Sequence, residues 1–338
     1  MCLLLRRRRL YLSSPSRNYT TDTTSFNPQA YISSALHKFR SSPPRRIPAT
    51  LTPDRSASLT RALHPSASHL PRPSTLPQGH HMVYFEPLLT QKEKMSDGTD
   101  ISHWPGGPFA RRMWAGGSVT FDTSRQQQPQ LDSKTEMVCV ETIKSAKDDD
   151  VTIQINEFDL EKDKVFVDLE RSYLVGEQKV VEEKRKLVFM RERKPSLQAS
   201  PAAVKEVTAP WEPDLRYPLH PTRGLLKTFS ELTNNAHLIH LDREYAQKQE
   251  GYKDVLVQGP LTLVLMLEAL SKQGYVKHIE YRNLSPLFAD EKLDVCLKRK
   301  GGAAENNSQE GAEESWMVWI EGPGGRLAVK GKGVTCGH

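Results

Sequence analysis

Alternating apolar and polar positions predict a run of β-strands in the first part of the chain. The alternation has the two-residue period of a half-buried strand and is enriched in β-branched residues. Strands are predicted at residues 117–121, 137–146, 151–160, 164–174 and 186–193. The charged stretch QKVVEEKRK is either a strand end or a turn. Residues 82–194 are therefore predicted to form a mostly antiparallel sheet with little helix.

A run that is apolar on all sides predicts one long helix further along, GPLTLVLMLEALSKQG at residues 259–274. Pro260 fits the first turn, because its missing N–H would have no helical partner there. Gly274 is a natural C-terminal stop. The apolar residues surround the helix, so we expect it to be buried on most faces. Strands are predicted after it at residues 276–284, 292–300, 315–322 and 326–335.

These elements predict an α+β architecture. One apolar helix with four or five antiparallel strands is what a sheet wrapped around a helix requires. The first block offers a similar strand set with a poorer helix, so two related halves are the simplest interpretation. We expect an N-terminal half at residues 81–194, a linker rich in Pro, Ala and Ser at 195–210, and a C-terminal half at 211–338.

The positive charge belongs to the N-terminus. Residues 1–80 hold 12 Lys or Arg but only two acidic residues, whereas the remainder holds 35 basic and 39 acidic residues. An Arg- and Ser-rich, acid-poor leader is typical of mitochondrial targeting, here to the matrix, and the alternative is a plain disordered tail. We expect residues 1–80 to be a disordered basic leader. The body carries no basic patch, which argues against nucleic-acid binding.

The sequence also argues against a membrane-spanning helix and against a metal site. No run of 18 apolar residues exists, so no membrane span is expected. The four cysteines are far apart and form no CxxC pair, which argues against a zinc site or a disulfide framework. No metal and no cofactor is expected.

The candidate chemistry lies in TFSELTNNAHLIHLDREYA at residues 228–246, just before the apolar helix. Two asparagines, two histidines and an aspartate fall within nine positions. The bland interpretation is a polar loop that stabilises its own backbone, which is a common use of Asn. The neighbouring helix favours a catalytic interpretation instead.

The segment resembles the MaoC-like or hydratase-2 branch of the hot-dog fold. That family's motif is roughly D-x-N-P-x-H-x-D, followed by a Tyr-Ala and a His-Gly that opens a long helix. On this chain Asn235 falls at the aspartate, His237 at the asparagine and His240 at the histidine, and Gln258 stands where His is common. The resemblance implies a double hot-dog with a long central helix in the C-terminal half and a degenerate N-terminal half.

A narrower branch matches better. NNAHLIHLD, together with GGPFARRMWAGG upstream, is similar to the fungal mitochondrial 3-hydroxyacyl-thioester dehydratase type 2 and to bacterial mesaconyl-C4-CoA hydratases. In that branch an asparagine is usual at the position of Asn235. The resemblance covers about residues 80–338 and is strongest over 217–270. It implies a hydro-lyase that interconverts (3R)-3-hydroxyacyl and trans-2-enoyl thioesters, in mitochondrial type II fatty acid synthesis.

The chemistry of that reaction suits these residue types. Dehydration removes a proton from Cα and a hydroxyl from Cβ, and an imidazole is suited to both steps. We therefore assign His240 as the general acid/base and Asn235 as the group that orients water. The thioester oxygen gains negative charge, which a helix N-terminus at Gly259 stabilises, helped by the turn around Gln258. Side chains expected to shape an acyl tunnel are Phe229, Leu232 and Tyr245.

Several residues keep a second interpretation. His237 is as well explained by a structural hydrogen bond as by catalysis, and Asp242 by capping of the turn that follows. Two histidines and one aspartate are a thin set for a metal ion. The Arg111-Arg112 pair is better explained as a solvated turn than as a site for the phosphates of a pantetheine carrier.

The function also has alternatives. The chain is expected to act on acyl-carrier-protein or CoA thioesters, either as a monomer or as a homodimer of double hot-dogs. A CoA-thioester hydratase of a specialised or dicarboxylic acyl group is the second interpretation. A hot-dog thioesterase is a third, although no carboxylate stands at the start of the helix to activate water. A non-catalytic acyl-thioester-binding protein is the interpretation from another class.

Overall fold

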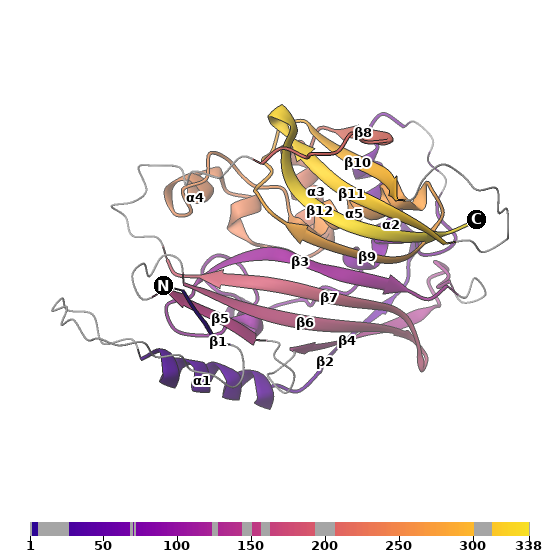
Figure 1. The fold of residues 1–338 in the computed structure, drawn as a ribbon. Coiled ribbons are helices and arrows are strands. Elements are labelled where there is room, and N and C mark those ends of the chain that lie inside the picture. The colour runs from indigo at the N-terminus through magenta and orange to yellow at the C-terminus, as the bar shows by residue number, and fades with distance from the viewer. Residues whose placement is uncertain are drawn as a thin grey trace.

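A single antiparallel sheet runs through both halves of the chain (Figure 1). The computed structural model describes residues 2–5, 27–67, 70, 72–123, 128–143, 151–156, 163–192, 207–300 and 313–337. Within these residues the strands follow the order β1-β5-β6-β7-β3-β9-β12-β11-β10-β8, and β2 and β4 join beside β6. The predicted α+β class with a large antiparallel sheet is confirmed.

The N-terminal set contains the strands that the alternation predicted. They are β3 Arg111–Phe121, β4 Glu136–Ile143, β5 Val151–Asn156, β6 Lys164–Val175 and β7 Gln178–Met190. Two short strands precede them, β1 Cys2–Leu5 and β2 Arg45–Thr50. The charged stretch QKVVEEKRK is part of β7, where every second side chain is buried from Val181 to Phe189. Of its two interpretations, the strand is the correct one.

The C-terminal set contains one helix-rich segment and five strands. The strands are β8 Leu215–Leu219, β9 Tyr275–Asn283, β10 Leu293–Lys300, β11 Glu313–Gly322 and β12 Arg326–Cys336. The helices are α3 Arg223–Leu232, α4 Arg243–Lys248 and α5 Gly259–Ser271. The predicted strands after the helix are confirmed, whereas β8 and α3 were not predicted.

Helix α5 is the buried helix that its apolar sequence predicted. Nine of its residues are buried, and it packs against β3 and against β9 to β12. The helix ends at Ser271, three residues before Gly274. Gly274 has a φ of +155°, and a Cβ there would lie 2.4 Å from the carbonyl oxygen of Cys336. This glycine therefore permits the close approach of β9 to the end of β12, rather than ending the helix.

The two strand sets meet where β3 pairs with β9, with Gly117 opposite Tyr281. A bulge interrupts β3 between Trp114 and Gly116. Gly116 has a φ of +145°, and a Cβ there would lie 2.3 Å from the carbonyl oxygen of Tyr281. Only glycine fits this bulge, which bends β3 beside the start of α5.

The expectation that residues 1–80 form a disordered leader is wrong for the part from residue 27 onward. Helix α1 spans Pro28–Ser41 and helix α2 spans Pro53–Leu63. Phe39 and Leu59 are fully buried, and β2 pairs with β4. The many Arg and Ser residues suggested disorder, but among them stand a few apolar residues whose helical spacing places their side chains in the core.

Two sequence predictions lie outside what the structure describes. Residues 6–26 of the leader and residues 195–206 of the expected linker are not among the described residues. None of the described helices is long and apolar enough to cross a membrane.

Candidate active site

The polar segment after α3 folds into a short turn beside the first turn of α5. Helix α3 ends at Leu232, and Asn234 follows with a left-handed φ of 49°. Asn235 donates its backbone N–H to the carbonyl of Ser230 at 2.9 Å. A 3-10 turn, Leu238–His240, then leads into α4. This local folding turns the side chains of the segment toward one cavity.

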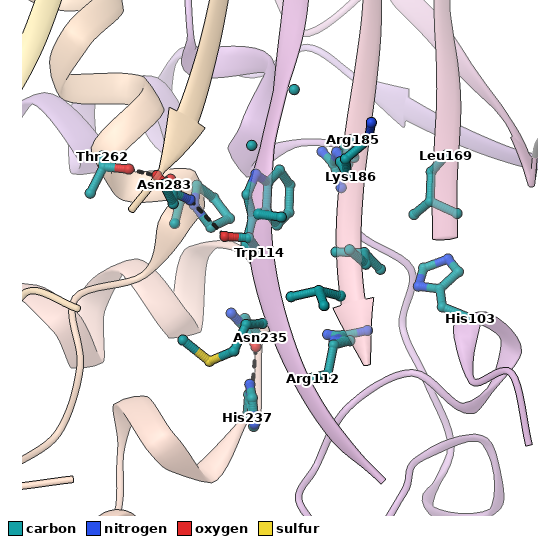
Figure 2. A pocket seen from close by; sticks show the side chains of 18 of the residues that line it. His103, Arg112, Trp114, Leu169, Arg185, Lys186, Asn235, His237, Thr262 and Asn283 are labelled. Carbon is teal, nitrogen blue, oxygen red and sulfur yellow. Dashed lines mark hydrogen bonds between the residues drawn. The ribbon is translucent and has the colours of Figure 1, made fainter. Parts of the chain in front are cut away.

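The cavity has a volume of about 1260 Å³ and is bordered by both strand sets (Figure 2). Asn235, His237, His240 and Gly259 of the C-terminal half line it. From the sheet, Arg112 and Trp114 of β3 and Asn283 of β9 complete this part of the wall. Four of the predicted site residues are thus brought together.

His240 presents one ring nitrogen to the cavity. Its Nδ1 lies 2.8 Å from the carbonyl oxygen of Leu256, which can only accept, so Nδ1 carries the proton and Nε2 keeps its lone pair. Burial lowers the pKa of His240 to about 4, the hydrogen bond to Leu256 raises it, and nearby Arg112 lowers it. The ring is therefore a neutral base at physiological pH.

Asn235 is oriented by its own loop. Its side-chain oxygen accepts the backbone N–H of His237 at 3.1 Å. This hydrogen bond turns the amide nitrogen away from the loop, and Asn235 lines the cavity (Figure 2). The side chain can therefore donate to an oxygen bound there.

His237 is held rather than free to react. Its Nε2 lies 3.4 Å from the Oδ2 of Asp97, and its ring meets the ring of His240 edge-on with centroids 5.4 Å apart. Burial lowers the pKa of His237 well below its usual range, and His240 and Arg112 lower it further. Asp97 also accepts the backbone N–H of Leu238 through its carbonyl, at 2.9 Å. This geometry supports the structural interpretation of His237.

The first turn of α5 is open at Gly259. A Cβ at this position would lie 2.8 Å from the Cβ of Trp114, so only glycine fits. Gln258 is the N-cap residue, but its side chain makes no capping hydrogen bond. Instead its Nε2 donates to the carbonyl of Leu226 at 2.8 Å and to the Oγ of Ser230 at 3.0 Å. Gln258 thus fastens α5 to α3 and does not line the cavity.

The predicted acyl tunnel does not match the structure. Phe229 is fully buried in the main core, and Leu232 packs against that core from the surface. Tyr245 packs on a small cluster with Ile239 and Leu256. None of the three lines the cavity. Apolar side chains at helical spacing give the same sequence pattern whether they contact a substrate or pack in the core, so the sequence does not distinguish the two.

Asp242 has the capping role that was its second interpretation. Its Oδ1 accepts the backbone N–H of Tyr245 at 2.9 Å, at the start of α4. Among the residues that the structure describes, no group of three or more His, Cys, Asp or Glu is placed to hold a metal ion.

The prediction that Arg111 and Arg112 lie in a solvated turn is wrong, because both belong to β3. The Nε of Arg111 lies 2.6 Å from an oxygen of Glu250, whereas Arg112 lines the cavity. Arg112 and Trp114 share one strand face, and this two-residue spacing was the signal that sequence reasoning missed. Asn283, whose Nδ2 donates to the carbonyl of Trp114 at 2.8 Å, offered no signal in the sequence.

Comparison with known proteins identifies the family. The sequence model of hydroxyacyl-thioester dehydratase type 2 matches residues 79–289. The mitochondrial hydroxyacyl-thioester dehydratase type 2 of Schizosaccharomyces pombe is 27% identical over 247 residues, covering 68% of this chain and 79% of that protein. The mesaconyl-C(4)-CoA hydratase of Chloroflexus aurantiacus is 32% identical over 222 residues, covering 64% of this chain and 72% of that protein.

A solved structure supports the fold. The MaoC-like dehydratase of Phytophthora capsici superposes with a TM-score of 0.60 at 15% identity, covering 90% of this chain and 99% of that one. The resemblance that was read from NNAHLIHLD and GGPFARRMWAGG is confirmed. The chain belongs to the hydroxyacyl-thioester dehydratase type 2 family, a family of hydro-lyases.

Proposed function

We propose that the protein interconverts (3R)-3-hydroxyacyl thioesters and trans-2-enoyl thioesters. The observation that carries this proposal is the meeting of Asn235, His240 and Gly259 on one cavity wall. An imidazole with a free lone pair, a carboxamide and an uncapped helix start are the three groups that the reaction needs.

In the dehydration direction, the Nε2 of His240 takes the proton from Cα and the C–H electrons pass to the thioester carbonyl. The backbone N–H of Gly259 and the dipole of α5 stabilise the resulting oxyanion. The imidazolium then protonates the Cβ hydroxyl, which the amide of Asn235 holds, and water leaves as the double bond forms. Hydration runs through the same positions in reverse.

The low pKa of His240 fits the first of these steps. A neutral imidazole accepts a proton without first losing one, and the pKa of about 4 follows mainly from burial of the ring. Once His240 has taken the proton, the charged ring is disfavoured in the same surroundings. The proton is then readily passed on to the departing hydroxyl.

We further propose that the two strand sets are the halves of a double hot-dog. In the C-terminal set α5 is the helix that the sheet surrounds. In the N-terminal set, β3 and the 3-10 turn His80–Val83 contact α5, and no Asn/His pair from the described residues of this set lines the cavity. The N-terminal half would then complete the cavity without doing chemistry, as a degenerate half. The similarity to a MaoC-like dehydratase over 90% of this chain supports this division.

We place the protein in the mitochondrial matrix, acting in type II fatty acid synthesis on acyl-carrier-protein or CoA thioesters. The mitochondrial name of the fission yeast relative and the basic, acid-poor first residues support this location. The bacterial relative, named for mesaconyl-C(4)-CoA, supports the alternative of a CoA-thioester hydratase with a specialised acyl group. A homodimer of double hot-dogs remains part of the proposal.

One experiment separates these functions. The full chain is given crotonyl-CoA, then (3R)- and (3S)-3-hydroxybutyryl-CoA, and the enoyl-thioester absorbance is followed. Turnover of the 3R epimer alone, lost when Asn235 and His240 are both replaced by alanine, is the expected result. Thioester hydrolysis instead of hydration would identify a thioesterase. Binding without any absorbance change would identify a non-catalytic acyl-binding protein.

A further inference from the structure

A turn of the N-terminal half packs against the catalytic segment of the C-terminal half. Lys94 and Asp100 form a single antiparallel bridge that closes residues 94–100 into this turn, the 94–100 turn. The Oδ2 of Asp100 accepts a hydrogen bond from the Nη1 of Arg45 in β2 at 2.7 Å, which fastens the turn to the N-terminal strand set. The tip of the turn contacts residues 236–238 of the other half.

Gly98 permits a very close contact at this tip. Its φ is +85°, and a Cβ there would lie 2.1 Å from the carbonyl oxygen and 2.8 Å from the carbonyl carbon of Ala236. Only glycine fits both this left-handed conformation and this separation. Ala236 stands between Asn235 and His237 in the sequence, so the backbone that carries these two side chains rests directly on the 94–100 turn.

Asp97, the residue before Gly98, holds the segment by its side chain and by its backbone. Its Oδ1 accepts the backbone N–H of Thr99 at 2.9 Å and the hydroxyl of Thr99 at 2.7 Å, which fixes the carboxylate within the turn. Its Oδ2 lies 3.4 Å from the Nε2 of His237. Its carbonyl accepts the N–H of Leu238 at 2.9 Å. Asp97 is buried, with 4% of its surface exposed, so water does not compete for these contacts.

The position of His237 is passed on to both proposed catalytic side chains. The side-chain oxygen of Asn235 accepts the backbone N–H of His237 at 3.1 Å (Figure 2). The ring of His240 packs edge-on against the ring of His237, with centroids 5.4 Å apart. A shift of His237 would therefore displace the amide of Asn235 and the imidazole of His240 together.

The carboxylate of Asp97 also selects the tautomer of His237. Burial keeps His237 neutral by lowering its pKa well below the usual range. A carboxylate can only accept a hydrogen bond, so the proton of the neutral ring is favoured on Nε2, which faces Asp97. An asparagine at position 97 would offer both a donor and an acceptor to that nitrogen, and the selection would be lost.

We propose that Asp97 is a positioning residue of the active site: it holds His237 in place, and His237 in turn places the two groups that do the chemistry. This inference rests on the proposed function. Asp97 itself does not line the cavity, so its effect on the reaction passes through His237. The active site is then built by both halves of the chain, although the reacting side chains come from one.

Asp97→Asn tests the proposal with little change of volume. In the hydration of crotonyl-CoA by the full chain, kcat should fall by about 10- to 100-fold, because a misplacement of roughly 1 Å at a reacting group costs on the order of 100-fold. KM should stay within about threefold, since Asp97 does not contact the substrate. A purely structural role would instead lower the Tm and leave the kcat of the folded enzyme unchanged.

The matched control is Asp132→Asn. The Oδ1 of Asp132 likewise closes a turn, accepting the backbone N–H of Lys134 at 2.9 Å and that of Thr135 at 2.8 Å, but Asp132 is exposed and does not line the cavity. This variant should keep kcat within about twofold of the wild type, as surface substitutions usually do. Equal values of kcat in the two variants would overturn the proposal.

A pair of glycine variants tests the backbone contact separately. Gly98→Ala places a methyl group against Ala236, whereas Gly106→Ala adds one at a φ of +91° with no atom within 4 Å. Both variants strain a left-handed residue, but only the first displaces the catalytic segment. Gly98→Ala should lower kcat by at least about tenfold more than Gly106→Ala does. Equal losses of kcat would contradict the role of the 94–100 turn. If Gly98→Ala does not fold, Asp97→Asn decides.

A measurement without substrate keeps this inference separate from the proposed function. Nitrogen-15 NMR of the full chain reports which ring nitrogen of His237 carries the proton, with the signals assigned from their absence in His237→Ala. We expect the proton on Nε2 in the wild type and a mixed or reversed tautomer in Asp97→Asn. If crotonyl-CoA is not hydrated but the tautomer changes in this way, the proposed reaction fails while the hold of Asp97 on His237 stands. A tautomer that is the same in both proteins would overturn the inference.

Discussion

Gly259 opens helix α5 directly against Trp114 of strand β3, so closely that a Cβ at position 259 would lie 2.8 Å from the Cβ and 2.9 Å from the Cγ of Trp114. Trp114 cannot easily retreat, because its indole N–H donates to the hydroxyl of Tyr281 at 2.7 Å and its carbonyl accepts from Asn283. The start of the helix and the adjoining strand therefore fix the distance between the proposed oxyanion site and the cavity wall.

Gly259→Ala is expected to damage both stability and activity. Overpacking against Trp114 should cost about 1–3 kcal/mol of unfolding free energy. Displacement of the first turn of α5 should also lower kcat by at least about tenfold, because an oxyanion donor works only at its proper distance. Chemical denaturation and hydratase kinetics measure the two effects.

Gly224→Ala is the matched control. Gly224 lies in the first turn of α3 with an ordinary φ, and the nearest atom to an added Cβ is the Oγ1 of Thr222 at 3.6 Å. Alanine in a helix is worth up to about 1 kcal/mol relative to glycine, so this variant should be unchanged or slightly more stable. Equal behaviour of the two variants would contradict the packing argument.

His240→Ala is expected to reduce kcat by roughly 10²- to 10⁴-fold, the usual contribution of a general acid/base. KM should change far less, because the histidine acts on protons rather than on the bulk of the substrate. Steady-state kinetics with crotonyl-CoA gives both constants. His237→Ala provides the comparison, and a larger loss of kcat there than in His240→Ala would reverse the assigned roles.

Much of this architecture could be predicted from the sequence. The strands and α5 followed from their periodicity, because burial of one strand face or of a whole helix leaves a direct mark on residue order. The Asn/His segment was recognisable through its residues and its place before α5. The interpretation as a polar loop that stabilises its own backbone and the catalytic interpretation differ only in what the side chains face. The sequence does not show which way the side chains point, so the three-dimensional structure was needed.

The features that the sequence missed depend on contacts between distant segments. Asp97 contacts His237 because the loop around residue 97 lies on the segment after α3. Arg112 lines the cavity because its strand, β3, pairs with β9 of the other half. Nothing in a local pattern records such a meeting. In the same way, α1 and α2 are amphipathic enough to pack, although the composition of residues 1–80 is that of a disordered leader.

The protein is expected to lose stability as the pH falls from about 6.5 toward 4. Burial lowers the pKa of His80, His81 and His240 to about 4 each, below the value of about 6.5 expected in the unfolded chain. Between these values the unfolded state binds more protons, so acid favours unfolding. Thermal melts across this interval should show a falling Tm, and a constant Tm would contradict the assignment of neutral buried rings.

His81 offers the variant that tests this explanation. Its ring is fully buried beside Tyr173, and neither nitrogen has a hydrogen-bond partner among the described residues. His81→Leu removes the two unsatisfied polar atoms at similar volume, so the Tm at pH 7 should be unchanged or higher. The decline in Tm toward pH 4 should also be shallower, because His81 no longer binds a proton more readily in the unfolded chain than in the folded one. A steeper decline would show instead that the charged form of His81 stabilises the folded protein.

Arg171 is expected to be among the most costly residues to neutralise. It is fully buried and contacts Glu141 at 2.6 Å and Glu86 at 2.7 Å. Arg171→Met keeps most of the side-chain volume but leaves those carboxylates without their main partner, which should cost about 3–5 kcal/mol. Urea denaturation of the full chain measures this. Lys248→Met, which breaks the exposed pair with Glu244 on α4, should cost no more than about 0.5 kcal/mol. If the two variants lose similar amounts, the buried network contributes no more than a surface ion pair.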